Sequence, residues 1–438
     1  MSILPALSSR FQLRQRGTTV SRELRGAVAT FLTMAYILFV NPLIISQATG
    51  MTPEVQHSLL ACTALAAGIC SILMGVFANF PLALASGMGL NAIVAFAIAP
   101  AAGSWQGAMG LIVLDGVVTL LLVLIGLREA IMNAIPRDLR LAIGAGIGLF
   151  IAFIGLVNGG IVQVNVAAAP VKPGTWHEPA TAVTIIGLVI TSVLVARKVK
   201  GALIIGILAT TAIGFAFGVS HLPTALHWPT FTAAFKADIP AALKWHLLPL
   251  LFAVIMVDFF DTLGTASAIA EEGKLTDEQG RIPGIRNILL IDSLSAAIGG
   301  LLGASSVTSY IESAAGVAEG ARTGLHSVFV GLMFLVAIVL APIAGIVPAA
   351  ATAPALILVG YLMISQVARI DYSNADTAIP AFITLITIPM TYSIAHGIGY
   401  GFITFVAIKI FTGRFNEAHP LMYVTAAAFA AQFLLSTQ

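Results

Sequence analysis

Long apolar stretches recur along nearly the whole of the 438-residue chain, and each is about as long as an α-helix that crosses a lipid bilayer. Charged residues make up only 9% of the sequence and hydrophobic residues 58%, whereas a soluble domain carries roughly 25% charged residues. A water-soluble globule of this composition would expose a mostly apolar surface, so this surface must face lipid. The sequence therefore predicts an all-α integral membrane protein.

Fourteen of these stretches are predicted to span the membrane. We place the first seven spans at residues 26–47, 58–78, 80–100, 104–126, 129–157, 180–196 and 200–219. The second seven follow at residues 247–270, 284–303, 305–321, 325–347, 350–368, 376–394 and 396–413. One more apolar piece, from His419 to Leu435, either forms a fifteenth span or lies on the membrane surface. No positive charge flanks it, and we favour the surface helix.

The distribution of positive charge tests this count, because cytoplasmic loops carry an excess of Lys and Arg. If the N-terminus lies in the cytoplasm, fourteen spans place eighteen of the 21 Lys and Arg residues on the cytoplasmic side. Only Lys172, Lys236 and Lys244 fall on the other side, and none is predicted inside a span. A miscounted helix would scramble this segregation, so we expect fourteen spans and a cytoplasmic N-terminus.

Two sets of seven spans predict an inverted repeat, because seven is odd and the second set enters the membrane from the opposite side. The third and tenth spans are unusual in both sets. Each opens with a run of small residues, at 83–89 and 303–309, before a helix that is too short to cross alone. Unwound backbone is tolerated inside a bilayer only where it is buried in protein or lines a cavity. We expect the two interruptions to mark a transporter's binding site, with close packing of small-residue helices as the alternative.

Five carboxylates are predicted inside spans: Asp115, Asp258, Asp261, Asp292 and Glu312. A carboxylate at the bilayer centre costs at least about 2.5 kcal/mol, so each is either a functional group or a structural hydrogen-bond anchor between helices. Without a basic partner, these acids must be protonated, hydrogen-bonded to hydroxyls and backbone, or bonded to a ligand that donates. Burial favours proton uptake by a carboxylate, and that chemistry suits proton coupling.

Four polar positions are distinctive. Asp258 and Asp261 stand three residues apart on one face of the eighth span, where two neighbouring carboxylates disfavour simultaneous ionisation. Glu312 follows the interruption of the tenth span, near a helix N-terminus whose dipole favours the charged form of a carboxylate. Asn91 occupies the comparable place in the third span and offers both a donor and an acceptor.

Other chemistries find no support in the sequence. All eight histidines fall in loops or at span ends, so we expect no metal site, and no Walker motif indicates ATP as an energy source. Cys62 and Cys70, eight residues apart on one helix, are too far apart for a disulfide. The net charge of +2 does not indicate nucleic acid as a partner. No nucleophile–base pair indicates an enzyme, so we expect no catalytic residues and no cofactor besides a coupling ion.

A series of motifs extends over nearly the whole chain, and the most specific is Thr308-Ser309-Tyr310-Ile311-Glu312-Ser313. The motifs stand at residues 17–19, 23–26, 31–37, 41–42, 87–92, 126–130, 258–265, 306–313, 316–317, 322–324, 378–382 and 411–413. Together they resemble AzgA-like purine permeases, a branch of the nucleobase:cation symporter-2 family.

The resemblance implies a uracil-permease-type fold, in which short antiparallel strands in spans 3 and 10 meet at the membrane midplane. Its core domain would comprise spans 1–4 (residues 26–126) and 8–11 (residues 247–347). Its gate domain would comprise spans 5–7 (residues 127–219) and 12–14 (residues 348–413). The remaining segments would be a cytoplasmic N-terminal segment (1–25), an extracytoplasmic connection (220–246) and a C-terminal apolar segment (414–438).

The resemblance also implies a function and a set of site residues. It implies proton-coupled import of adenine, guanine or hypoxanthine across a bacterial inner membrane by alternating access. The substrate-binding positions of the family match Asp261, Glu312 and Asn91. The residues expected to take part in proton coupling or structural support are Asp258, Asp292, Asp115, Thr265 and Ser309. A homodimer through the gate domains is a further family expectation.

Three departures from the family pattern leave the exact purine open. Asp115 stands where a glutamate is expected, Ile93 where an aromatic residue is usual, and residues 374–377 lack the usual acidic pair. A carrier of xanthine, urate or uracil with the same fold is therefore an alternative. An anion transporter of the sulfate or bicarbonate type is a second one, although it would require an intramembrane basic residue or a bare helix N-terminus. A channel, a receptor and a membrane-embedded enzyme fit the pattern less well.

Overall fold

The structure is a computed structural model that describes residues 8–126, 135–165, 169–222, 228–277 and 282–435. Within these residues, eight helices are long and apolar enough to cross a membrane, judged by length and composition. The prediction of a mostly helical membrane protein is therefore confirmed.

The first half of the chain forms seven successive segments. They are α2 (Val20–Met34) with α3 (Ile37–Ile45); α4 (Pro53–Leu73); β1 (Leu84–Ser86) with α5 (Met88–Ile93) and α6 (Ala99–Ala102); α7 (Trp105–Leu124); α9 (Arg137–Asn158); α10 (Pro179–Ala196); and α11 (Ala202–Ala216). Turns of π-helix continue α4 through Met74–Ala78 and α5 through Val94–Ile98. Only the third of these segments opens with a strand.

The second half repeats this order after the short helix α12 (Ile239–Ala242). Its segments are α13 (Leu248–Gly273); α14 (Ile285–Leu301); β4 (Val307–Ser309) with α15 (Ser313–Ala318); α16 (Gly324–Ala337); α17 (Ala349–Ile364); α18 (Ala375–Met390); and α19 (Ile394–Phe411). Turns of 3-10 helix follow α16 through Ile338–Ile346 and α17 through Ser365–Arg369. The chain ends in α20 (Pro420–Leu435). The strand again opens the third segment.

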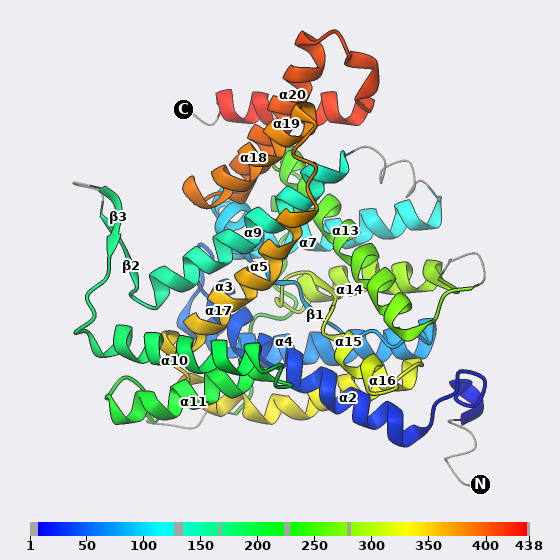
Figure 1. Cartoon of the computed structure of the whole chain (residues 1–438), viewed down its shortest axis with the longest axis vertical. Helices are drawn as coiled ribbons and strands as arrows, with labels where there is room; N and C mark the ends of the chain where they lie inside the picture. Colours follow the sequence, from blue (N-terminus) through cyan, green and yellow to red (C-terminus); the bar gives the residue numbers. More distant parts are fainter. Residues whose placement is uncertain (1–7, 127–134, 166–168, 223–227, 278–281, 436–438) are drawn as a thin grey trace.

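The two strands pair with each other, as the family resemblance implied. β1 and β4 are antiparallel, with Leu84 opposite Ser309 and Ser86 opposite Val307. All the residues of both strands are buried. In Figure 1, β1 lies close to the centre of the view, surrounded by helices. A short buried sheet thus joins two segments that lie about half the chain apart.

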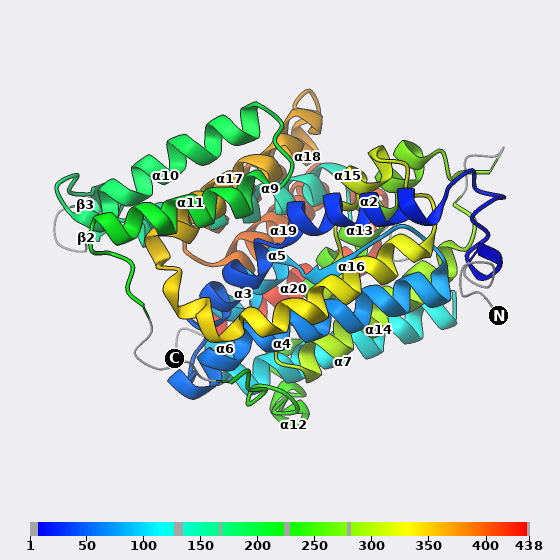
Figure 2. The ribbon, with the colours of Figure 1, turned by 90° about the horizontal axis from the view of Figure 1, so that it is seen from below.

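The helices pack in two sets of neighbours. In one set, α16 packs against α2 and α4, and α14 packs against α4 and α7; Figure 2 shows these helices side by side. In the other set, α9 packs against α17 and α18, α18 against α19, and α17 against α10 and α11. Small residues allow close approach: a Cβ added at Gly331 of α16 would lie 2.6 Å from the carbonyl oxygen of Gly68 in α4.

The first helix begins six residues before its predicted start. α2 begins at Val20 because the Thr19 side chain caps it by accepting a hydrogen bond from the Arg22 N–H. Glu23, which the sequence analysis placed in the cytoplasmic segment 1–25, is fully buried. Its carboxylate accepts hydrogen bonds from the backbone N–H groups of Arg322 (2.8 Å) and His326 (3.1 Å) at the start of α16. These backbone donors satisfy an acid that would otherwise stay in water.

Lys409 contradicts the prediction that every basic residue lies outside the spans. It lies in the last turn of α19 and is only 6% exposed. Its ammonium group donates to Asp376 (3.0 Å) and Glu417 (2.6 Å), and Arg414 also pairs with Asp376 at 2.7 Å. A buried charge is retained when it is paired in this way. The sequence alone did not place these acids beside Lys409.

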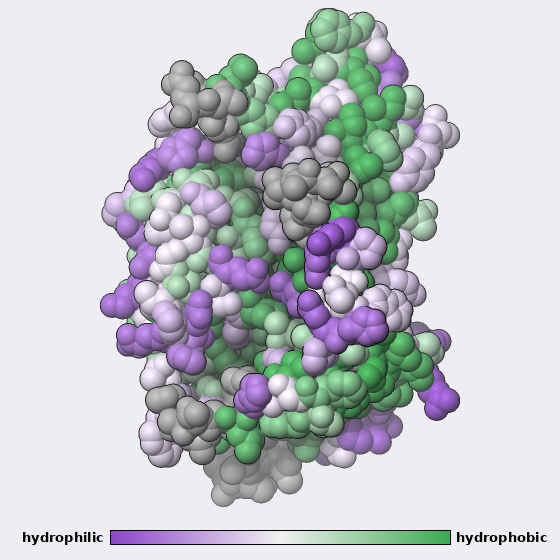
Figure 3. Space-filling model, turned by 90° about the vertical axis from the view of Figure 1, so that its left-hand side faces the viewer, coloured by the Kyte–Doolittle hydropathy of each residue, from purple (hydrophilic) through white to green (hydrophobic). Residues whose placement is uncertain are grey.

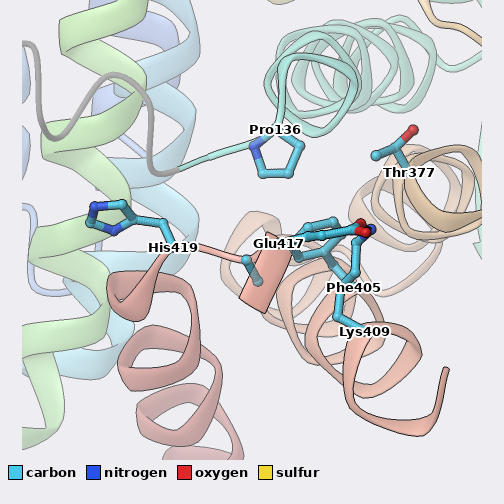
Figure 4. A pocket seen from close by; sticks show the side chains of 7 residues that line it. Pro136, Thr377, Phe405, Lys409, Glu417 and His419 are labelled. Atoms are coloured by element: carbon cyan, nitrogen blue, oxygen red, sulfur yellow. Dashed lines mark hydrogen bonds and ion pairs between the residues drawn. The ribbon is translucent and has the colours of Figure 1, made fainter. Parts of the chain in front are cut away.

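The same ion pairs border a pocket at the end of α19. Figure 4 shows Lys409, Glu417 and Phe405 together on one side, with Pro136 and His419 across from them. Thr377 contributes to the lining from α18 and donates a hydrogen bond to Asp138 of α9 (2.9 Å). The pocket and its hydrogen bonds therefore tie the chain after α19 to the beginnings of α9 and α18.

Two terminal or connecting segments differ from simple loops. Val162–Asn165 (β2) and Ala169–Pro173 (β3) form an antiparallel hairpin between α9 and α10, which the sequence analysis did not predict. Figure 3 views the end of the molecule that carries this hairpin, where polar side chains gather across the middle of the face.

The predicted C-terminal helix forms as α20; it packs against α19 and buries Met422 and Phe429, while Val424 is exposed.

Candidate functional site

The paired strands place the two interrupted segments against each other with local two-fold symmetry. Besides the ladder, the Gly87 N–H donates to the Ser306 carbonyl (2.9 Å) and the Tyr310 N–H donates to the Ala83 carbonyl (3.0 Å). Tyr310 and Ser306 stand 223 residues after Gly87 and Ala83, and β4 follows β1 by the same interval. The two bonds are therefore equivalent, as an inverted pair of segments requires.

Asn91 lies in α5, one turn after Gly87, and is fully buried. Among the residues that the structure describes, neither its amide nitrogen nor its amide oxygen has a hydrogen-bond partner. A buried polar group without a partner costs roughly 1–3 kcal/mol, and in native proteins such a group calls for an explanation. A ligand that both accepts from and donates to this amide would provide one.

Glu312 occupies the turn between β4 and α15, where it is the N-cap residue of α15. Its side chain is half-buried, and the Tyr36 hydroxyl donates to Oε1 at 2.9 Å. The placement agrees with the prediction that Glu312 follows the interruption at a helix N-terminus. α15 packs against both α2 and α13, so the carboxylate lies between the first and eighth segments.

Asp261 lies on α13 and, unlike the other four predicted acids, is exposed. Gly264 and Ser267, about one and two turns further along the helix, are exposed as well. Asp261 interacts electrostatically with Asp292 and with Glu312. The structure therefore brings Asp261 and Glu312 to one accessible region. Asn91 lies on α5, which packs against α13, and its amide is not hydrogen-bonded to either acid.

Three further acids, Asp115, Asp258 and Asp292, are buried behind this region and interact electrostatically with one another. Asp292 accepts hydrogen bonds from Thr262 (2.5 Å) and Ser309 (2.8 Å). Among the described residues, Asp115 has one hydrogen bond, which its Oδ1 accepts from the Thr119 hydroxyl at 3.5 Å. Both carboxylate oxygens of Asp258 lack a hydrogen-bond partner among the described residues. Of the three, Asp292 is thus the most firmly bound and Asp258 the least.

The two hydroxyls predicted to support the acids have different positions. Ser309, in β4, holds Asp292 as just described. Thr265 is buried on α13, one turn after Asp261, and the hydrogen bonds of the described residues include none between Thr265 and these carboxylates. Thr262 and Thr308 take the expected supporting place instead, since their hydroxyls lie 3.1 Å apart and Thr262 reaches Asp292.

The sequence analysis also missed three polar residues at the strands. Tyr36 donates to Glu312, and Tyr310 donates to the Ser86 carbonyl at 2.5 Å. Asn41, fully buried in α3, donates to the Thr63 and Ser86 hydroxyl oxygens and to a backbone carbonyl. All three stand within the family-like motifs. A hydroxyl or amide within an apolar span carries no charge, however, and the search for intramembrane charges passed over them.

Comparison with known proteins agrees with this architecture. Residues 21–400 match the model of a family described as a permease family. A putative permease of Methanocaldococcus jannaschii is 42% identical over 99% of both chains. The adenine permease AdeQ of Escherichia coli is 41% identical, over 98% of this chain and 96% of its own. The guanine/hypoxanthine permease PbuG of Bacillus subtilis is 40% identical, over 97% and 98%.

Solved structures show the same fold at much lower sequence identity. The transmembrane domain of the cyanobacterial bicarbonate transporter BicA aligns with a TM-score of 0.61 at 15% identity, over 89% of this chain and 96% of that one. The structure of SLC26A9 aligns with a TM-score of 0.62 at 11% identity, over 90% of this chain and 66% of that one. The family match and the full-length relatives confirm the AzgA-like resemblance, and this chain is therefore a member of that permease family, a membrane transporter and not an enzyme.

Proposed function

We propose that this permease is a proton-coupled symporter that imports purine nucleobases, namely adenine, guanine or hypoxanthine, across the bacterial plasma membrane. The observation that carries the proposal is Asn91: its buried amide has no hydrogen-bond partner among the described residues, and its helix α5 packs against α13, which carries Asp261. The relatives named as adenine and guanine/hypoxanthine permeases support the same substrate class.

The chemistry of the three side chains matches the edge of a purine. A purine ring presents N–H donors beside nitrogen or oxygen acceptors. Ionised carboxylates only accept hydrogen bonds, and an amide both donates and accepts. Asp261 and Glu312 would therefore accept hydrogen bonds from the purine N–H groups. The Asn91 amide would pair with an edge of the ring that carries both a donor and an acceptor. The substrate would thereby satisfy the polar atoms that the protein leaves without partners.

Proton coupling is assigned to the buried acids. Asp115, Asp258 and Asp292 are buried together, and neighbouring carboxylates in a region of low dielectric do not all ionise without a cation. Asp258, whose oxygens accept no hydrogen bond of good geometry from the described residues, is the group best suited to bind and release the proton. Asp292 and Asp115, with Ser309 and Thr265, would support the site. In the accessible region, Glu312 is the second candidate for protonation.

The remaining expectations concern architecture. We propose fourteen spans in a 7+7 inverted repeat, with the N-terminus in the cytoplasm. The two sets of packed helices support a core domain of spans 1–4 and 8–11 and a gate domain of spans 5–7 and 12–14. In alternating access, the core would carry Asp261, Glu312 and Asn91 past the gate. A homodimer through the gate domains completes the proposal.

Two alternatives remain distinct from it. A carrier of xanthine, urate or uracil would use the same site with a different ring, and competition between nucleobases separates it from a purine importer. The fold is also that of a bicarbonate transporter, but the accessible region here presents the carboxylates of Asp261 and Glu312. Two carboxylates without a facing cation repel an anionic substrate.

The test is uptake of labelled hypoxanthine into proteoliposomes, with and without an imposed inward proton gradient. We expect accumulation that depends on the gradient and is competed by adenine or guanine. Glu312→Gln removes an accepting oxygen and should reduce uptake at least ten-fold. Glu319→Gln is the matched control, because Glu319 is an exposed acid that pairs with Lys200. Bicarbonate or sulfate transport without purine transport would refute the proposal.

A further inference from the structure

Tyr36 lies at a break in the first membrane-spanning segment. α2 ends at Met34 and α3 begins at Ile37, so Tyr36 stands between two helices that together form one apolar stretch of 26 residues. The side chain is 2% exposed and packs in the main hydrophobic core. Its hydroxyl, the one polar atom of the side chain, donates to Glu312 Oε1. The bond joins segments that are 276 residues apart in sequence.

This bond acts on the orientation of a flexible acid. Glu312 has three rotatable side-chain torsions and is only half-buried, so the surrounding protein does not hold its carboxylate by packing alone. The bond from Tyr36 to Oε1 restricts the orientations of this carboxylate, which interacts electrostatically with Asp261. A hydrogen bond to an ionised acceptor is among the stronger protein hydrogen bonds.

We propose that Tyr36 is a positioning residue for substrate recognition, which holds the Glu312 carboxylate in the orientation that accepts a purine N–H. The inference rests on the proposed function and adds a residue on the first segment to the site. Its consequence is specific: without the Tyr36 hydroxyl, binding weakens because the carboxylate must be ordered when the substrate arrives. The later movement of the loaded carrier is unaffected.

The first experiment measures KM and Vmax for hypoxanthine in proteoliposomes. Tyr36→Phe should raise KM about ten-fold, equivalent to about 1.4 kcal/mol, and leave Vmax per folded transporter within about two-fold. Tyr423→Phe is the matched control, because it removes a hydroxyl that bonds the Phe415 carbonyl at 2.7 Å, outside the site.

A second measurement separates positioning from a structural anchor. Competition by hypoxanthine methylated at N1, N7 or N9 identifies the N–H whose loss is most costly in the parent protein. In Tyr36→Phe, methylation of this N–H should reduce affinity several-fold less than in the parent, because the misaligned carboxylate forms a weaker hydrogen bond with the N–H. If Tyr36→Phe lowers Tm or the yield of folded protein, while the folded protein keeps the parent's KM and methyl penalties, then Tyr36 is a structural anchor. That result would overturn the inference.

The outcomes also separate this inference from the proposed function. If the parent protein does not take up or bind any purine, the proposed function fails and the role of Tyr36 in purine recognition fails with it. If the parent transports purines and Tyr36→Phe has the parent's KM and the parent's methyl penalties, only the role of Tyr36 is refuted.

Discussion

Single polar side chains inside this apolar protein fall into two kinds, those with partners and those without. The Asn41 amide nitrogen donates to three acceptors within the core, although its oxygen has no partner among the described residues; both amide atoms of Asn91 lack a partner there. Both residues are fully buried, so burial alone does not distinguish them. We therefore propose that Asn41 stabilises the fold and that Asn91 binds a ligand.

Replacing each asparagine by leucine, which has a similar shape, tests this distinction. Asn41→Leu should destabilise the protein by about 1–3 kcal/mol, because buried acceptors lose their donor. Asn91→Leu should leave Tm unchanged or slightly raised, because no protein hydrogen bond is lost, and should abolish purine uptake. Thermal melts and uptake of the two purified variants provide the measurement. A large fall in Tm for Asn91→Leu with uptake retained would show that Asn91 is structural.

Asp258 allows a similar test of proton coupling. Asp258→Asn keeps the shape of the side chain, and no hydrogen bond among the described residues is lost. We expect this variant to retain exchange of labelled for unlabelled purine but to lose accumulation driven by a proton gradient. Asp292→Asn is the comparison, because its amide cannot accept from both Thr262 and Ser309 as the carboxylate does, and its Tm should fall. Accumulation at the parent level in Asp258→Asn would move the coupling proton to another group.

At the residue scale, charge was the most informative signal in the sequence. An acid in an apolar helix is conspicuous, and four of the five predicted acids lie on α13 and α14, which contact β4, or in the turn that follows β4. The fifth, Asp115, lies on α7, which packs against α14. The accessibility of Asp261 and the burial of Asp258, only three residues away on α13, did not follow from helical spacing. They depend on which neighbouring segments cover the helix. Hydroxyl partners such as Tyr36 and Thr262 depend in the same way on contacts between distant segments.

At the scale of elements, the length of the apolar stretches located the helices well. The family resemblance predicted strands in the third and tenth spans, and β1 and β4 lie within the small-residue runs that open them. The antiparallel pairing of β1 and β4 agrees with the resemblance that suggested it. The hairpin β2–β3 was missed because its strands are only four and five residues long, and such short polar segments resemble loops. The ends of helices were less certain: the start of α2 depends on the Thr19 cap and on donors from α16, which are distant in sequence.

The helix end at Lys409 yields a prediction about stability. Lys409 is largely buried between Asp376 and Glu417, so Lys409→Met leaves Asp376 with Arg414 alone. We expect a lower Tm, because removing one partner of a shielded ion pair leaves its counterpart uncompensated. Lys200→Met is the control: Lys200 pairs with Glu319 at a surface where both side chains are accessible, and such pairs contribute little. Equal shifts in Tm for the two variants would contradict this interpretation.

At the scale of the whole molecule, the two sets of packed helices meet near the site. Phe96, which follows α5, contacts the rings of Phe150 in α9 and Tyr392 after α18, with ring centroids 5.6 Å apart in both cases. Phe153 of α9 also contacts Tyr392, at 6.0 Å. If the proposed core moves past the proposed gate, these edge-to-face contacts must break in each cycle. On this proposal, the aromatic cluster is a contact between two moving bodies and not part of one rigid core.

A reversible cross-link between the two sets tests whether they move. A Cβ added at Gly89 of α5 would lie 3.3 Å from Ile147 Cγ2 of α9, which places Gly89→Cys and Ile147→Cys within reach of a disulfide. The two native cysteines are buried and free, so Cys62→Ala and Cys70→Ala provide the background. Oxidation of the double-cysteine variant should abolish purine uptake, and a reductant should restore it, because the disulfide fixes core to gate.

Each single-cysteine variant, treated with the same oxidant, controls for damage to the site, since Gly89 stands two residues before Asn91. Uptake in these variants should not respond to oxidation. The oxidised double variant should still bind purine from one side of the membrane, because the disulfide arrests movement and not recognition. The rise in Tm on adding purine measures this binding. Full uptake after complete cross-linking would mean that α5 and α9 stay together throughout transport. The boundary between the moving bodies would then have to lie elsewhere, and Phe96 would belong with Phe150 and Tyr392 in a single unit.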